Sequence, residues 1–264
     1  THKYINPVDG ANLILTIDET IQYIVEREIE KVFKERGAKS ASIIVMDPAT
    51  GEILALSCRP TFDPNNYAKY PALNRHNFAI NDAYEPGSTM KVITAAMAME
   101  EKIVDGESRF FCPGYTKVGK ETIRCANGRA HGSQTFAQIV ENSCNVGFVQ
   151  VGLDLGLEKY FKYVKAFGFG KATGIDLPGE EDGILVPEKK AQQIDLATMA
   201  FGQANAVTPI QLITAVGAVA NDGKLMKPHL VKQIIDNNGK VIKKFDPVVV
   251  RRVISEETAH QLCL

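Results

Sequence analysis

The segment "NDAYEPGSTMKVITAAMAMEE", Asn81–Glu101, places a serine at the start of a helical pattern. Pro86 and Gly87 mark a sharp bend into that helix, where backbone N–H groups have no intrahelical partner. Ser88 and Lys91 are three residues apart and therefore share one helix face. A neutral, partly desolvated lysine amine at that place could take the proton of the serine hydroxyl and make it a nucleophile. On these residues alone, the commoner explanation is a helix N-cap followed by a solvated lysine.

Composition limits the possible functions. The chain has 264 residues, 45% of them hydrophobic, which is enough for one large domain with a sizeable core. Its formal net charge of −1 gives no reason to expect a nucleic-acid partner. No run approaches the roughly 18 apolar residues that span a membrane, and the first residues do not form a signal peptide. Because the chain does not begin with Met, we expect a fragment whose membrane anchor lies upstream.

Periodicity predicts strands near both ends of the chain and helices between them. Residues 18–37 carry an amphipathic helix that Gly37 ends, and residues 41–58 form two strands joined by a turn. Residues 208–223 begin a helix at Thr208, and residues 229–245 form a second hairpin. The middle, from residue 102 to about 183, is predicted to hold helices and irregular loops.

The predicted fold class is therefore α+β, an antiparallel sheet flanked by helices. A helical subdomain at roughly 88–200 is inserted between the sheet strands.

Ser88 and Lys91 complete an S-x-x-K pattern within "YEPGSTMK", which resembles the nucleophile motif of class B penicillin-binding proteins. Further segments resemble signatures of that family in the same order along the chain: "GANLILTIDETIQ", "ASIIVMDPATGEILALSCRPTFDPN", "ENSCN", "GFGKATGIDLPGE" and "MAFGQANAVTPIQL". The chain is most similar to the sporulation and elongation/division transpeptidases of Firmicutes. The resemblance implies the penicillin-binding transpeptidase and serine β-lactamase fold over residues 1–264.

"ENSCN" corresponds to the second family motif, S-x-N. Ser143 and Asn145 alternate along the backbone, so both side chains can face a cleft while Cys144 faces away. A hydroxyl beside Lys91 can shuttle a proton, and an amide can hold a substrate carbonyl. The third motif, K-T-G, is absent, and "KATG" at 171–174 has one residue too many to replace it. The last residues resemble the helix before that motif, so we expect the domain to be incomplete at its C-terminus.

The resemblance also implies a reaction. Ser88 would attack the penultimate D-Ala of a peptidoglycan stem peptide ending in D-Ala-D-Ala, with Lys91 as general base and Ser143 and Asn145 beside it. The backbone N–H of Ser88 would stabilise the oxyanion, and an amine from a second strand would release the acyl group. β-Lactam antibiotics would acylate the same serine.

The implied setting is the extracytoplasmic face of the membrane, with a glycosyltransferase partner. Two alternatives are a β-lactamase, for which Glu180 and Glu181 are candidate bases, and a non-catalytic β-lactam sensor.

Three of the five cysteines fall near a histidine in one short span. Cys112, Cys125, His131 and Cys144 together have the composition of a structural zinc site, although their spacing is not the usual one. A disulfide between Cys112 and Cys125 is a second possibility, since family members act outside the cytoplasm. Unpaired buried thiols are a third. The acyl-transfer chemistry itself needs no cofactor.

Overall fold

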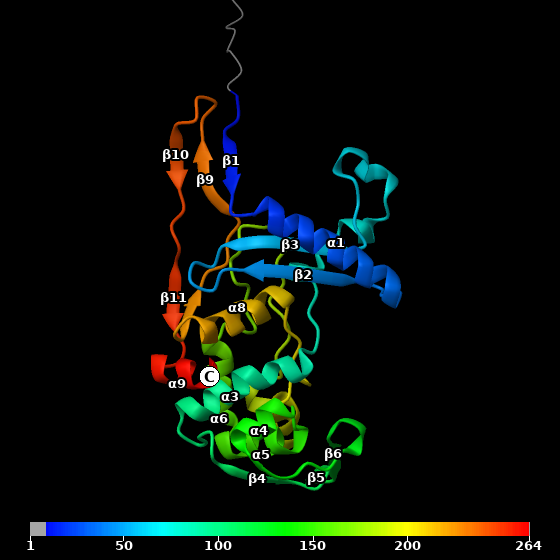
Figure 1. Cartoon of the computed structure of the whole chain (residues 1–264), viewed down its shortest axis with the longest axis vertical. Helices are drawn as coiled ribbons and strands as arrows, with labels where there is room; N and C mark the ends of the chain where they lie inside the picture. The colour runs from blue at the N-terminus through cyan, green and yellow to red at the C-terminus, as the bar shows by residue number, and fades with distance from the viewer. Residues whose placement is uncertain (1–8, 264) are drawn as a thin grey trace, which may run out of the picture.

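The computed structural model describes residues 9–263, and its elements are stacked along the long axis of the molecule (Figure 1). At one end lies an antiparallel sheet with the strand order β1-β9-β10: β1 (Asn12–Leu15), β9 (Val231–Ile235) and β10 (Val241–Lys244). Next comes the antiparallel hairpin of β2 (Ala41–Met46) and β3 (Ile53–Arg59), against which α1 (Glu19–Arg36) packs. Most of the remaining helices lie beyond this hairpin (Figure 1). The predicted α+β class, with antiparallel strands flanked by helices, is confirmed.

The predicted helix boundaries are confirmed where capping residues define them. The side chain of Asp18 accepts a hydrogen bond from the N–H of Ile21 at the start of α1, and Gly37 ends that helix in a left-handed conformation. Thr208 and Gln211 form a capping box at the start of α8 (Pro209–Ala220), whose first residue is a proline.

The core surrounds α3 (Met90–Glu100), most of whose side chains are buried, Lys91 among them. Its neighbours are five helices: α4 (Phe136–Glu141), α5 (Asn145–Leu155), α6 (Leu157–Ala166), α8 and α9 (Glu256–Cys263). Further regular elements are α2 (Phe78–Asn81), α7 (Gln193–Met199) and the paired strands β8 (Lys224–Met226) and β11 (Val249–Arg252). In the part of the chain that the structure describes, no helix is both long and apolar enough to cross a membrane.

The prediction of only helices and irregular loops between residues 102 and 183 was wrong. Four short strands occur there: β4 (Arg109–Cys112), β5 (Tyr115–Val118), β6 (Glu121–Arg124) and β7 (Gly132–Thr135). β4 pairs with β7, and β5 pairs with β6. Each has only four residues, which is too short for an alternating pattern to stand out from the surrounding glycines and lysines.

Candidate active site

Ser88 lies in a single 3-10 turn, Gly87–Thr89, that leads directly into α3. The chain before this turn pairs with a distant segment, because the backbones of Tyr84 and Val207 exchange hydrogen bonds of 3.0 and 2.9 Å. The N–H of Gly87 donates to the carbonyl of Gly202 over 2.8 Å. The turn that carries Ser88 is therefore held by residues 202–207 as well as by its own helix.

Gly202 is a positioning residue that the sequence did not identify. Its φ of +88° lies in the region that favours glycine, and a Cβ added there would overlap the carbonyl oxygen of Gly87. The segment "MAFGQANAVTPIQL" contains this glycine, but nothing in the segment indicates which backbone it contacts.

We expect Gly202→Ala to lower the free energy of unfolding by at least about 2 kcal/mol, because backbone strain and overpacking each cost about 1–3 kcal/mol. The variant should also react more slowly at Ser88, since the turn is displaced. Gly106→Ala is the matched control, because a Cβ added there has no atom within 4 Å. Urea denaturation compares the two. Equal stability of both variants would show that the contact between Gly202 and Gly87 does not constrain the turn.

Lys91 connects the two predicted motifs. Its side chain is only 3% exposed, and its Nζ lies 3.2 Å from Ser88 Oγ. The same nitrogen lies 2.7 Å from the carbonyl oxygen of Ser143, 2.9 Å from Ser143 Oγ and 2.7 Å from Asn145 Oδ1. The structure thus brings together all four residues that the sequence nominated for catalysis.

Burial lowers the pKa of Lys91 to about 8, although the thiols of Cys144 and Cys125 offset part of this effect. In the part of the chain that the structure describes, no carboxylate forms an ion pair or hydrogen bond with Lys91. About half of the Lys91 amine is consequently neutral near pH 8.

The groups around Nζ can accommodate a neutral amine. The carbonyl oxygen of Ser143 and Oδ1 of Asn145 can only accept hydrogen bonds, whereas the hydroxyls of Ser88 and Ser143 can accept or donate. A neutral amine has two N–H groups and one lone pair. If the two N–H groups donate to the two carbonyl oxygens, the lone pair is left for a hydroxyl. This arrangement allows Lys91 to accept the proton of Ser88.

The S-x-N segment is a tight turn and not an extended strand. Ser143 adopts a left-handed conformation with φ of 49°, and Cys144 is the N-cap of α5, whose first residue is Asn145. Cys144 is fully buried, and its sulfur lies 3.7 Å from that of Cys125. The amide Nδ2 of Asn145 donates to the carbonyl of Arg124 over 3.0 Å, which fixes the orientation of the Asn145 side chain.

The four predicted metal ligands also lie together. Cys112 ends β4, Cys125 follows β6, His131 precedes β7, and Cys144 is the N-cap of α5. Their ligand atoms all lie within 4.8 Å of one another. The sulfurs of Cys112 and Cys125 are 3.5 Å apart, those of Cys125 and Cys144 are 3.7 Å apart, and Cys112 Sγ lies 3.5 Å from His131 Nδ1. At 3.5 Å, Cys112 and Cys125 are not joined by a disulfide in this structure.

The ionisation of these thiols is uneven. Burial raises the pKa of Cys112, but hydrogen bonds from the backbone and ring of His131 outweigh it and lower that pKa to about 6. Burial raises the pKa of Cys125. A thiol of low pKa is largely ionised at neutral pH, which is the form that binds metals.

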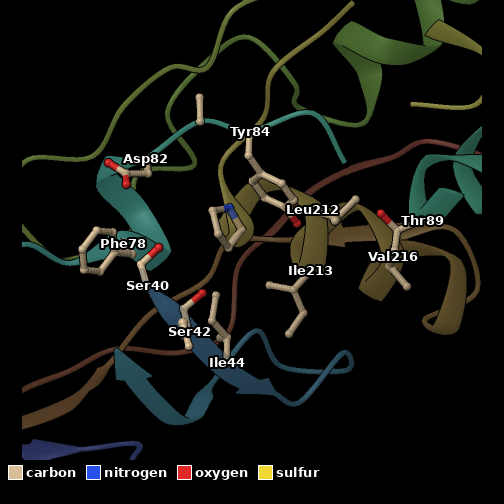
Figure 2. Close-up of a pocket in the computed structure, with 13 residues that line it drawn as sticks. Ser40, Ser42, Ile44, Phe78, Asp82, Tyr84, Thr89, Leu212, Ile213 and Val216 are labelled. Carbon is tan, nitrogen blue, oxygen red and sulfur yellow. The ribbon is translucent and has the colours of Figure 1, made fainter. Parts of the chain in front are cut away.

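A hollow of about 700 Å³ lies between β2, α2 and α8. Figure 2 shows Ser42 and Ile44 of β2 on one side, Leu212 and Ile213 of α8 on another, and Tyr84 above them. The hollow reaches the nucleophile turn through Thr89, but none of the four candidate catalytic side chains lines it. Among the residues described, β2 pairs only with β3, so its other edge borders this hollow. The volume of this hollow therefore does not identify it as the catalytic site.

Glu180, one candidate base of the β-lactamase alternative, stabilises a loop. Its carboxylate accepts hydrogen bonds from the N–H and hydroxyl of Thr173, both 2.6 Å, and from the N–H of Gly174 at 2.9 Å. Glu181 is exposed, and its N–H donates to the carbonyl of Ile80. Within residues 9–263, neither carboxylate forms a hydrogen bond with Ser88 or Lys91.

Comparisons with known proteins indicate what the chain resembles. The family model described as "Penicillin binding protein transpeptidase domain" matches residues 41–263. The chain is 44% identical to stage V sporulation protein D of Bacillus subtilis, over 98% of the chain and 41% of that protein. It is 32% identical to a protein of Neisseria meningitidis named "Probable peptidoglycan D,D-transpeptidase PenA", over 97% of the chain and 42% of that protein.

A crystal structure of penicillin-binding protein 3 from Mycobacterium tuberculosis, complexed with ampicillin, has the same fold. It superimposes with a TM-score of 0.88 at 29% identity, over 98% of this chain and 57% of that one. The chain spans about two-fifths of the length of the two curated relatives, with coverages of 41% and 42%.

Proposed function

The chain belongs to the penicillin-binding protein transpeptidase family, and on this premise we propose that it is the catalytic part of a serine D,D-transpeptidase acting on peptidoglycan. One observation carries the proposal: a buried lysine amine stands between the hydroxyls of Ser88 and Ser143 and the amide of Asn145. The PenA relative, which is named as such a transpeptidase, supports the reaction class.

In the proposed mechanism, neutral Lys91 accepts the proton of Ser88 while Oγ attacks the carbonyl of the penultimate D-Ala. The backbone N–H of Ser88 contributes to oxyanion stabilisation. The tetrahedral intermediate collapses when the bond to the terminal D-Ala breaks, and its amine takes a proton that Lys91 releases through Ser143. An amine of a second stem peptide then attacks the acyl-enzyme, loses its proton to Lys91, and restores Ser88 as a hydroxyl.

The same serine is proposed to be the target of β-lactam antibiotics, as the ampicillin complex of the structural relative suggests. We further propose that the protein acts on the extracytoplasmic face of the membrane, together with a glycosyltransferase partner. Spore formation is the process that the name of the Bacillus relative indicates. A β-lactamase is the weaker alternative, because Glu180 is held by Thr173 and Gly174.

A turnover assay tests the proposed function. The full-length protein is incubated with a stem pentapeptide and an acceptor amine, and released D-Ala and the cross-linked product are quantified. Formation of both is the expected result. Fast hydrolysis of penicillin would favour the β-lactamase, and stable penicillin labelling without any peptide turnover would favour the sensor.

We also propose that Cys112, Cys125, His131 and Cys144 hold a structural zinc ion. Tetrahedral zinc with Zn–S bonds of about 2.3 Å places its sulfurs about 3.8 Å apart, close to the observed separation of 3.7 Å between Cys125 and Cys144. Four protein ligands leave no position for a catalytic water, so zinc would supply stability and not chemistry. Since Cys144 lies between Ser143 and Asn145, the ion would hold both side chains in place from behind.

Purified full-length protein should therefore contain about one zinc ion per chain, measured by elemental analysis without added metal. Cys144→Ser should lose the metal, whereas Cys58→Ser, which changes a half-buried thiol outside the cluster, should keep it. Chelation should lower the melting temperature and slow acylation without changing the acylated residue. Affinity should fall with decreasing pH, because protons compete for the thiolates. Metal-free protein with Cys112 and Cys125 disulfide-bonded would rule the site out.

A further inference from the structure

An open groove of about 380 Å³ lies beside the S-x-N turn, between the β4–β5 region and α5. Phe111 and Tyr115 line one side of it, and Val146, Gln150 and Asp154 of α5 line the other. In Figure 1, β4 and β5 run next to α5 at the end of the molecule opposite to the sheet of β1. Nothing in the proposed reaction uses this groove.

The groove begins close to the candidate active site. Val146 directly follows Asn145, so the two residues place one end of the groove beside the S-x-N turn. Tyr115 is paired with Arg124 across β5 and β6, and the carbonyl of Arg124 accepts a hydrogen bond from Asn145. Paired residues on neighbouring strands are about 5 Å apart. Tyr115 therefore lies about 5 Å from Arg124, whose carbonyl contacts Asn145.

The lining combines aromatic rings with uncharged polar groups. Phe111 is 67% exposed and Tyr115 is 47% exposed, which is unusual for adjacent aromatic side chains in one groove. Thr116, Gln150 and Asp154 add hydrogen-bond donors and acceptors. The described residues that line the groove include no lysine or arginine, although the guanidinium of Arg124 lies 5.9 Å from the centre of the Tyr115 ring. A ligand with flat apolar faces and many hydroxyl and amide groups matches this chemistry, and a chain of N-acetylated sugars has these properties.

We propose that this groove binds the glycan strand that carries the stem peptide, an inference that rests on the proposed function. A stem peptide is covalently attached to a glycan, so the glycan must lie near the site when the peptide reaches Ser88. Phe111 and Tyr115 would stack against sugar rings, while Gln150 and Asp154 would hydrogen-bond hydroxyl and acetamide groups. A protein partner is a poorer match, because a stable protein interface buries about 1,200–2,000 Å², and a groove of about 380 Å³ lined by nine residues offers only part of that area.

The probe is a peptide-free oligosaccharide of alternating N-acetylglucosamine and N-acetylmuramic acid, added to full-length protein carrying Ser88→Ala to prevent turnover. Methyl NMR signals of Val146 and Val149, which line the groove, should shift on titration. Phe111→Ala and Tyr115→Ala should each weaken binding by roughly three- to tenfold, the loss expected for one stacked ring. Tyr23→Ala is the matched control, because Tyr23 is also 67% exposed but lies on α1, and it should bind normally.

Two outcomes would overturn the inference. One is that millimolar oligosaccharide leaves the Val146 and Val149 signals unchanged. The other is that a sugar-free stem peptide, and not the oligosaccharide, shifts them, which would assign the groove to peptide. Penicillin labelling of the protein with intact Ser88 separates the two proposals. If penicillin labels the protein but the oligosaccharide does not bind, only the groove proposal is wrong. If the oligosaccharide binds but penicillin does not label the protein, only the assignment of Ser88 as nucleophile is wrong.

Discussion

Replacing Ser88 with alanine is expected to reduce D-Ala release from a stem pentapeptide to the background rate. The substitution removes the attacking oxygen, and loss of a serine nucleophile elsewhere costs on the order of 10⁶-fold in kcat. The fold should survive, because Lys91 keeps its contacts with the carbonyl and hydroxyl of Ser143 and with Asn145. Release of D-Ala is measured together with the melting temperature of the variant.

Ser133→Ala is the control for this experiment. Ser133 is an exposed serine on β7, outside the Ser88 site, so its variant should turn over substrate like the unmodified protein. Substantial turnover by Ser88→Ala would mean that another residue is the nucleophile.

Replacing Lys91 with methionine should slow acylation of Ser88 by about 10²–10⁴-fold, the usual contribution of a general base. Methionine keeps the buried stem but leaves Ser143 O and Asn145 Oδ1 without their donor. We therefore expect a loss of about 1–3 kcal/mol of stability as well. Stopped-flow acylation by a chromogenic β-lactam, recorded on protein shown to be folded, measures the rate.

Two further measurements distinguish a base from a fixed positive charge. Lys91→Arg keeps the charge but cannot release a proton at accessible pH, so it should be nearly as slow as the methionine variant. In the unmodified protein, the acylation rate should rise with pH and level off above about 8, since only the neutral amine accepts the serine proton. A normal rate in Lys91→Arg, or a rate that is flat between pH 6 and 9, would identify Lys91 as an electrostatic group and not the base.

The residues of the site were predicted from the sequence more completely than the contacts that hold those residues in place. Ser88, Lys91, Ser143 and Asn145 could be nominated because several short motifs resemble those of one family in the same order, and the structure brings the four side chains together. The capped helices α1 and α8 could be predicted for the same reason, since their end signals lie within a few residues.

The missed features depend on contacts between distant residues. Gly202 must be glycine because of the backbone of Gly87, which is far away in the sequence. The carbonyl of Arg124 orients Asn145 through a hydrogen bond that no local pattern encodes. The composition of the cysteine cluster was evident, but its closeness depends on β4 and β7, two strands that were not predicted.

Intact-mass analysis after incubation with penicillin, followed by peptide mapping, tests the central claim most directly. If Ser88 is the acylated nucleophile, the protein gains the mass of one penicillin molecule, and the label maps to the peptide that contains Ser88 and Lys91. A stable adduct that maps to any other residue would contradict the assignment of Ser88, as would complete absence of label on folded full-length protein.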